Sequence, residues 1–138
     1  MTAKELLERI VKLRKAIDYR KTKVETLRAA TESTTVQLTG MPRGHGENRS
    51  QMEAAACRKM DLEREIADLE AERKALIDYI DYVDDDDLSR LLTLRYVQEE
   101  KWEFIMTEMG YCSTHIYRIH QKAVKKLDEF LKDGSKNE

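Results

Sequence analysis

The sequence predicts an all-α protein, in which a long antiparallel helical hairpin (a coiled coil) precedes a C-terminal helix-turn-helix. Two long segments carry apolar residues at spacings of three and four, which is the period of a helix. Charged residues make up 38% of the chain and aromatic residues 7%, with five glycines and one proline. That composition favours long solvent-exposed helices over sheets, which need β-branched and aromatic runs broken by turns.

The first long helix is expected over residues 3 to about 31 and the second over residues 51 to about 83. The stripe of the first consists of Leu6, Ile10, Leu13, Ile17, Val24 and Leu27, with Arg20 or Lys21 interrupting it. The stripe of the second consists of Met52, Ala55, Leu62, Ile66, Leu69, Leu76, Ile80 and Val83, with Lys59 and Arg73 as polar interruptions. Residues 34–50 contain Gly40, Pro42, Gly44 and Gly46 and are expected to form the loop.

Charge favours pairing of these two helices within residues 1–83. Nine Lys/Arg and four Asp/Glu lie between Lys4 and Arg28, giving +5, whereas five Lys/Arg and nine Asp/Glu lie between Glu53 and Asp81, giving -4. Opposite charges on the flanks select the partner, while the apolar seam supplies the cohesion. A bundle of two hairpins, and hence a homodimer through the hairpin, stays open because a two-helix seam leaves Ile77 and Tyr79 uncovered.

Four aspartates, Asp84 to Asp87, separate the hairpin from the second predicted domain, residues 84–132. Asp86 or Asp87 is expected to cap a helix over residues 88–98, because a carboxylate suits the first turn. A metal site is disfavoured, because four consecutive carboxylates do not converge on one ion. Residues 133–138 are expected to be a disordered tail.

The helix-turn-helix is expected around Gly110 and Tyr111, where a turn needs a permissive residue. The inner face of the helix before the turn consists of Trp102, Ile105, Met106 and Met109. The inner face of the helix after it, over residues 113–127, consists of Ile116, Ile119, Ala123 and Leu127. Between Ser113 and Lys126 the second helix carries four cations and no acid, in a chain of formal net charge -2. Such a surface suits the phosphates of a DNA duplex.

The outward positions of that helix are the candidate DNA contacts. Arg118 suits a bidentate contact to guanine, Gln121 suits adenine, and Thr114 suits a thymine methyl or a phosphate. The candidate base contacts are Ser113, Thr114, Tyr117, Arg118 and Gln121. The candidate phosphate contacts are Lys101, His115, Lys122, Lys125 and Lys126. A basic helical face that is merely solvated is the alternative.

Other function classes find little support in the sequence. His115 and His120 are five residues apart and cannot share a metal on one helix face, and no glycine-rich phosphate loop is present. We therefore expect neither an enzyme nor a cofactor. No apolar run is long enough to cross a bilayer, and Met1 to Glu5 lack the apolar stretch of a signal peptide, so a cytoplasmic protein without membrane contact is expected. Cys57 and Cys112 are expected to be free thiols.

The C-terminal motifs resemble the region 4-like domain of bacterial sigma factors. The resemblance is carried by Leu94-Arg95-Tyr96-Val97, Trp102-Glu103-x-Ile105, Gly110-Tyr111-x-Ser113, His115-Ile116-Tyr117-Arg118-Ile119-His120 and Ala123-x-Lys125-Lys126-Leu127. Over its whole length the chain is similar to small phage and prophage proteins related to the RinA and ArpU late-gene regulators. The resemblance implies binding of promoter or other phage DNA, control of phage genes and host RNA polymerase as a partner. It also implies that Ser113, Thr114, Tyr117 and Arg118 read the promoter element.

The sequence departs from the family pattern at a few positions. Met106 stands where such motifs carry alanine, and Cys112 occupies the capping position of the recognition helix. Glu99 and Lys101 stand where the family often has glycine and a serine or threonine cap.

Three hypotheses follow from the sequence. The first is a phage or prophage DNA-binding transcription regulator. The second is a phage DNA-packaging protein, similar to a small terminase subunit, or an architectural DNA-binding protein. The third is a module that contacts polymerase without binding DNA. Assembly into a ring of many subunits would favour the second hypothesis, and the absence of duplex binding would favour the third.

Overall fold

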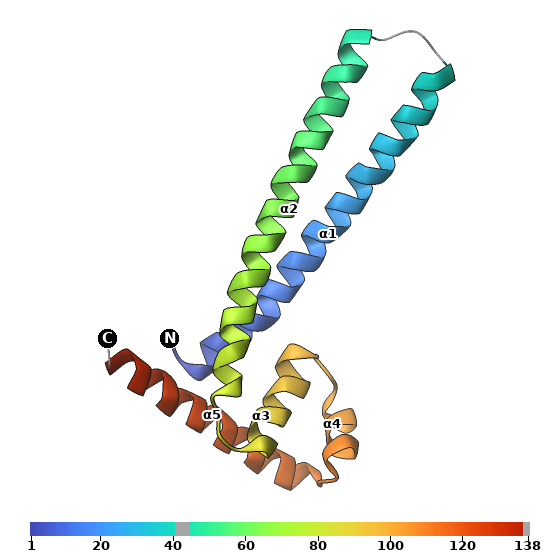
Figure 1. Ribbon diagram of the computed structural model, residues 1–138. Coiled ribbons are helices and arrows are strands. Elements are labelled where there is room, and N and C mark those ends of the chain that lie inside the picture. Colours follow the sequence, from blue (N-terminus) through green and yellow to red (C-terminus); the bar gives the residue numbers. More distant parts are fainter. Residues whose placement is uncertain (41–44, 137–138) are drawn as a thin grey trace. The chain divides into compact units, whose positions relative to one another are not determined.

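The computed structural model describes the backbone of residues 1–40 and 45–136, and the side chains of residues 1–30 and 50–133. Within these described residues, five α-helices and one π-helical turn follow one another (Figure 1). They are α1 (Ala3–Gly40), α2 (His45–Asp81), α3 (Asp86–Leu92), the π-helical turn η1 (Thr93–Val97), α4 (Trp102–Met109) and α5 (Ser113–Lys136). No strand occurs in the described residues, and the expected all-α class is confirmed.

The chain divides into two compact units that do not follow the domain boundary expected at residues 83 and 84. Unit 1 comprises residues 1–14 and 72–138, and unit 2 comprises residues 15–71. Unit 1 therefore combines the start of α1 and the end of α2 with all of the C-terminal helices. Unit 2 contains only the middle and distal parts of the two long helices.

In unit 2 the segments of α1 and α2 run in opposite directions (Figure 1). Ile17, Val24 and Leu62 are buried along the seam, whereas most of the expected α2 stripe is only half-buried. Two helices alone can shield little more than one narrow stripe of each other. Ion pairs flank the seam: Arg20 Nε lies 3.0 Å from Glu65 Oε2, and Lys21 Nζ lies 3.2 Å from Glu70 Oε1.

Two expectations about irregular segments are wrong. The loop expected over residues 34–50 is shorter, because the backbone is helical as far as Gly40 and again from His45. Residues 41–44 lie outside the described part of the chain. The tail expected to be disordered from residue 133 is also helical, because α5 continues to Lys136. Residues 137–138 lie outside the description. Glycine costs only about 1 kcal/mol relative to alanine within a helix, so a single glycine does not by itself end one.

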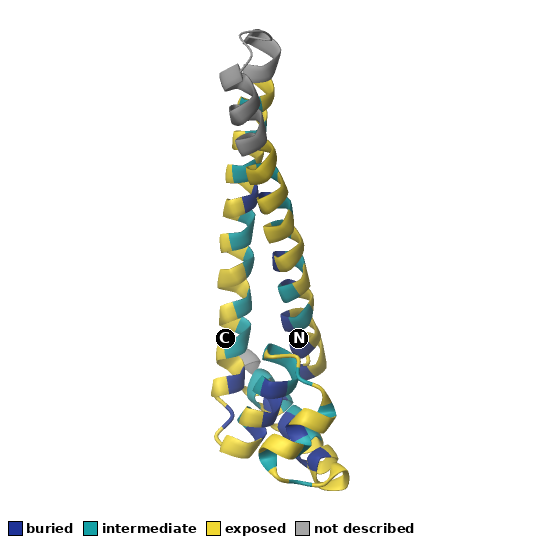
Figure 2. Cartoon of the chain, turned by 90° about the vertical axis from the view of Figure 1, so that its right-hand side faces the viewer, coloured by how far each residue is buried: buried dark blue, intermediate teal, exposed yellow. Residues whose placement is uncertain are grey.

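Unit 1 is built around one apolar core that draws on both ends of the chain. Its buried members are Ala3, Leu6, Leu7, Ile10, Ile80, Val83, Leu88, Leu91, Leu92, Leu94, Ile105, Ile116, Ile119, Ala123 and Leu127. Figure 2 shows these buried positions in dark blue. The burial of Ile116, Ile119, Ala123 and Leu127 confirms the inner face expected for the helix after the turn.

The start of α1 is fixed to this core by two caps. Thr2 and Glu5 form a capping box, in which each side chain accepts a hydrogen bond from the other's backbone N–H at 3.4 and 3.2 Å. The carboxylate of Asp128 on α5 accepts a hydrogen bond from the backbone N–H of Ala3. The first turn of α1 is therefore held by a side chain 125 residues away in the sequence.

The helix expected over residues 88–98 begins earlier and changes type within its length. Asp85 is the N-cap of α3, and its carboxylate accepts hydrogen bonds from Asp87 N at 2.9 Å and Leu88 N at 3.4 Å. The expected capping by Asp86 or Asp87 is therefore wrong by one or two positions. The chain then widens into η1 and leaves it through Glu99, whose φ of 53° is left-handed. Glycine adopts that conformation without strain.

Candidate nucleic-acid interface

The turn between α4 and α5 is closed by Gly110, which has φ of 72°. The backbone N–H groups of Gly110 and Tyr111 both donate to the carbonyl of Met106, at 2.9 and 3.2 Å. This pairing at a left-handed residue ends a helix by satisfying its last carbonyls. A Cβ at Gly110 would meet nothing within 4 Å, so glycine is needed here for its backbone conformation and not for space.

Tyr111 ties the turn to two other elements of unit 1. Its ring lies half-buried against the core and 4.4 Å from the ring of His115, measured between centroids. Its hydroxyl donates to Asp87 Oδ2 at 3.1 Å. The Asp87 carboxylate raises the pKa of Tyr111, because it accepts this bond and repels the phenolate. Tyr111 thus fixes the start of α5 against α3.

All ten candidate DNA contacts are exposed in the structure. Nine of them lie on α5: Ser113, Thr114, His115, Tyr117, Arg118, Gln121, Lys122, Lys125 and Lys126. The tenth, Lys101, is the residue before α4. Tyr117 keeps 61% of its surface exposed. Arg118 and Lys122 therefore project from unit 1 and are not covered by α1 or α2 within it.

The exposed face of α5 changes sign along its length. From Ser113 to Lys126 its charged residues are all cations, whereas Asp128, Glu129 and Asp133 follow with only Lys132 between them. The helix begins beside the turn, and the carbonyl of Cys112 accepts the first bond of α5 from Ile116 N at 2.9 Å. Any anion-binding surface on α5 therefore extends from this first turn to Lys126.

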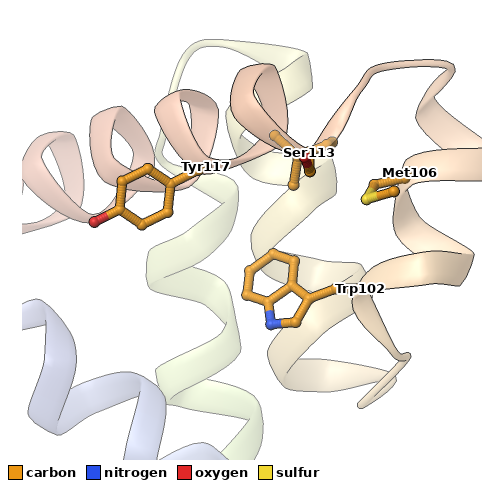
Figure 3. Close-up of a pocket in the computed structure, with 5 residues that line it drawn as sticks. Trp102, Met106, Ser113 and Tyr117 are labelled. Atoms are coloured by element: carbon orange, nitrogen blue, oxygen red, sulfur yellow. The ribbon is translucent and has the colours of Figure 1, made fainter.

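A pocket opens beside the first turn of α5, at the edge of the cationic stretch. Its volume is about 320 Å³, and it is lined by Trp102, Met106, Ser113, Ile116 and Tyr117. In Figure 3, Trp102 and Met106 of α4 lie across from Ser113 and Tyr117 of α5. Trp102 was expected to be core, but it is half-buried and forms one wall of this pocket. Met106 of α4 lines the pocket together with Trp102.

Sequence reasoning missed a polar and aromatic cluster behind α5. His120 Nε2 lies 2.8 Å from the hydroxyl of Tyr96, and the two rings stack with centroids 5.9 Å apart. The edge of Trp102 meets the His120 ring at 5.3 Å, and the guanidinium of Arg95 lies 4.6 Å from the Trp102 ring. Burial, with a further contribution from Arg95, lowers the pKa of His120. Burial raises the pKa of Tyr96.

This cluster positions α5 from its inner side. Tyr96 lies in η1 and Trp102 opens α4, so His120 joins α5 to both preceding elements. Nothing in the sequence around Arg95 and Tyr96, or in their separation from His120 along the chain, indicates this contact. A half-buried histidine between an arginine and two aromatic rings nevertheless favours the neutral imidazole, which can accept from or donate to the tyrosine hydroxyl.

The described side chains offer no group of three His, Cys, Asp or Glu placed to hold a metal ion. Cys57 and Cys112 are free and exposed. None of the helices, over the part that the structure covers, has both the length and the apolarity required of a membrane span.

Comparison with known families gives one match. Residues 46–128 match a family model described as "Protein of unknown function (DUF1492)". The matched segment extends from the start of α2 through the cationic stretch of α5. Neither the curated proteins nor the solved structures contain a match to the chain.

Proposed function

The chain belongs to the DUF1492 family, and we propose that it is a phage- or prophage-type transcription regulator that binds duplex DNA. In this proposal unit 2 and the ends of α1 and α2 form a helical hairpin, and α4 and α5 form a sigma region 4-like helix-turn-helix. The first half of α5 enters the major groove, where an α-helix fits. Host RNA polymerase is the further partner that the resemblance suggests.

The observation that carries the proposal is the exposed cationic stretch of α5 above a buried apolar underside. Ile116, Ile119 and Ala123 anchor the helix in the core, while Arg118 and Lys122 remain exposed on its other side. The turn at Gly110 and the Tyr111–Asp87 bond hold the first turn of α5 in place. A rigid helix with free cations near its start has the features that groove recognition needs.

A salt titration of duplex binding tests the proposal. Cations that contact phosphates release counterions, so the logarithm of the affinity should fall linearly with the logarithm of the salt concentration. Five phosphate contacts would give a slope of roughly -4 to -5. Absence of binding at low salt, or an affinity that hardly changes with salt, would contradict it.

Substitutions separate reading of the sequence from attraction to the backbone. Arg118→Ala should cost roughly 1–3 kcal/mol of discrimination at one base pair, because the bidentate contact to guanine is lost. Lys126→Ala should weaken binding to all sequences alike and reduce the salt slope by about 1. Arg64→Ala is a matched control, because Arg64 is also an exposed arginine but belongs to unit 2. Equal losses for all sequences with Arg118→Ala would count against base reading by this residue.

A second candidate function is a protein-interaction module that contacts polymerase or another factor without binding DNA. The pocket beside Trp102 favours it, since an apolar hollow of this size next to cations suits an apolar anchor flanked by acids. Trp102→Ala would then abolish partner binding, while duplex binding would be absent in the unchanged chain. The packaging or architectural alternative would instead require a ring of many subunits, which sedimentation detects.

A further inference from the structure

One stripe of α5 carries cations in its first half and carboxylates in its second half. Arg118, Lys122, Lys126, Glu129 and Asp133 follow one another at spacings of three or four residues, so they lie on the same face of the helix. All five side chains are exposed. The stripe therefore ends in negative charge, which disfavours nucleic acid beyond Lys126.

An aromatic patch lies on unit 1 next to the acidic half of this stripe. Phe130 of α5 stacks on Tyr82 with ring centroids 5.1 Å apart and an interplanar angle of 18°, and Tyr79 meets both rings edge-on at 6.1 and 6.4 Å. Tyr82 follows the last residue of α2 and keeps 59% of its surface exposed. Stacked aromatic rings that remain open to solvent are typical anchors of protein interfaces.

The charges around the rings disfavour a DNA duplex as the partner of this patch, because carboxylates outnumber the neighbouring cation Lys132. Asp78 and Asp81 flank Tyr79 on α2, and Glu129 and Asp133 flank Phe130 on α5. All four carboxylates are exposed. A partner must therefore bring cations around an apolar centre, and the first half of the α5 stripe has those cations.

We propose that two copies of the chain pair antiparallel through this face of α5. A two-fold axis that crosses α5 between residues 127 and 128 sets Lys126 opposite Glu129 of the second copy, and Lys122 opposite Asp133 of the second copy. Each contact occurs twice because a two-fold interface is self-complementary. The aromatic patch flanks the same crossing and provides the apolar anchor. A parallel arrangement would set like charges together and is disfavoured.

This pairing differs from the dimer through the hairpin in that all of its charged contacts lie on α5, although both would use Tyr79 of α2. It also has a consequence for DNA, which rests on the proposed function. Lys122 and Lys126 serve both surfaces, so a duplex and a second copy compete for them. When few target sites are occupied, pairing would then cover Lys122 and Lys126 and reduce the binding of the free protein to non-specific DNA.

Sedimentation equilibrium of the full chain without nucleic acid tests the pairing. At low ionic strength the average mass should rise with concentration from monomer towards dimer, and added salt should reverse the rise, because exposed ion pairs are screened. Tyr82→Ser should raise the dissociation constant of the dimer about tenfold, which corresponds to loss of one interface anchor. Tyr19→Ser is the matched control, since Tyr19 is 60% exposed but lies in unit 2.

A charge exchange tests the antiparallel register. Lys122→Glu alone and Asp133→Lys alone should each raise the dissociation constant about tenfold or more, because each sets like charges opposite one another. An equimolar mixture of the two variants should restore pairing, since all four contacts are again between opposite charges.

Three results would overturn the inference: a monomer at every concentration at low salt, a dimer insensitive to all three substitutions, or a mixture that does not recover. Circular dichroism of each variant checks that it keeps its helix content. Because the measurement contains no DNA, its failure leaves the proposed function standing, and failure of duplex binding leaves the dimer standing.

Discussion

Unit 1 and unit 2 are built from the same two long helices, yet they bury very different amounts of apolar surface. In unit 2 the seam contains Ile17, Val24 and Leu62 as buried residues, and ion pairs such as Arg20–Glu65 flank it. In unit 1 three further helices cover the same type of stripe, and the side chains that keep 1% or less of their surface are Ala3, Leu6, Leu7, Ile10, Leu13, Ile80, Leu91, Leu92, Ile105, Ala123 and Leu127. Among the described residues of unit 2, Leu62 alone is buried to that extent. A heptad stripe thus sets which face is apolar, while the number of neighbouring helices sets how deeply it is buried.

This difference determines how rigidly the helix of the proposed site, α5, is held. Helix α5 is fixed by a packed core, by the Tyr96–His120 bond and by the Tyr111–Asp87 bond. In unit 2 the ion pairs Arg20–Glu65 and Lys21–Glu70 join the two long helices, and exposed ion pairs are weak. We therefore expect local opening in unit 2 at lower free energy than in unit 1.

The largest expected effect comes from truncating the core of unit 1. Leu127→Ala should destabilise that unit by about 2–5 kcal/mol, because it removes a fully buried side chain among packed neighbours. Leu62→Ala in unit 2 should cost less, near the lower end of that range, because half-buried neighbours let water and side chains fill the space. Hydrogen exchange resolved by segment measures both. Equal costs would remove the distinction between the units.

A pH effect confined to unit 1 is expected from His120. Its pKa is lowered in the folded chain by burial and by Arg95, so the folded state binds its proton less readily than the unfolded state. Stability should therefore be full above the ordinary histidine pKa of about 6.5 and fall as the pH drops below it. Thermal unfolding between pH 7 and pH 5 measures this fall. His120→Phe keeps a ring in the stack but cannot titrate. In this variant the loss of stability that occurs at pH values above the titration range of the carboxylates should disappear.

A smaller effect is expected where the chain leaves η1. Glu99 has φ of 53° and forms an ion pair with Arg14 at 2.7 Å. Glu99→Gly and Glu99→Ala both remove the ion pair, but only glycine relieves the left-handed strain. The glycine variant should therefore be about 1 kcal/mol more stable than the alanine variant in urea unfolding. Equal stability of the two would mean that the backbone strain at this residue is negligible.

The smallest effect is expected in unit 2, at the polar interruption of its seam. Arg20 donates to Glu65 and to the carbonyl of Ala16 at 3.2 Å, and its side chain is 32% exposed. Arg20→Leu exchanges a partly screened ion pair for apolar contact and should change the stability by less than about 0.5 kcal/mol. A loss above about 1 kcal/mol in urea unfolding would show that the ion pair fixes the register of the two helices.

The periodic parts of the fold could be predicted from sequence because the helical period is a local property. The apolar spacing correctly predicted burial of Leu6, Ile10 and Leu13 in α1 and of Ile116 and Leu127 in α5. It also predicted which side of α5 is exposed, which is a condition for the proposed contacts. The depth of burial along α2 was not predictable, because it depends on how many helices cover each turn.

Contacts between distant elements could not be predicted. Arg73 interrupts the α2 stripe, and the structure gives the reason: its Nη2 donates to the carbonyl of Val97 at 3.1 Å. The His120–Tyr96 bond likewise joins residues 24 positions apart on different elements. Neither contact follows from spacing, because residues on separate elements share no common period. The length of the loop between α1 and α2 was also not predictable. Glycines and a proline indicate that a turn occurs, but they do not fix how many residues it contains.

The bond between Ala3 and Asp128 has a consequence for biosynthesis. Residues 3–10 leave the ribosome before residues 116–128, so the apolar faces of Leu6 and Ile10 gain their cover only when the later segment has been translated. Until then the nascent protein exposes this apolar surface to solvent, and such surface is what chaperones bind.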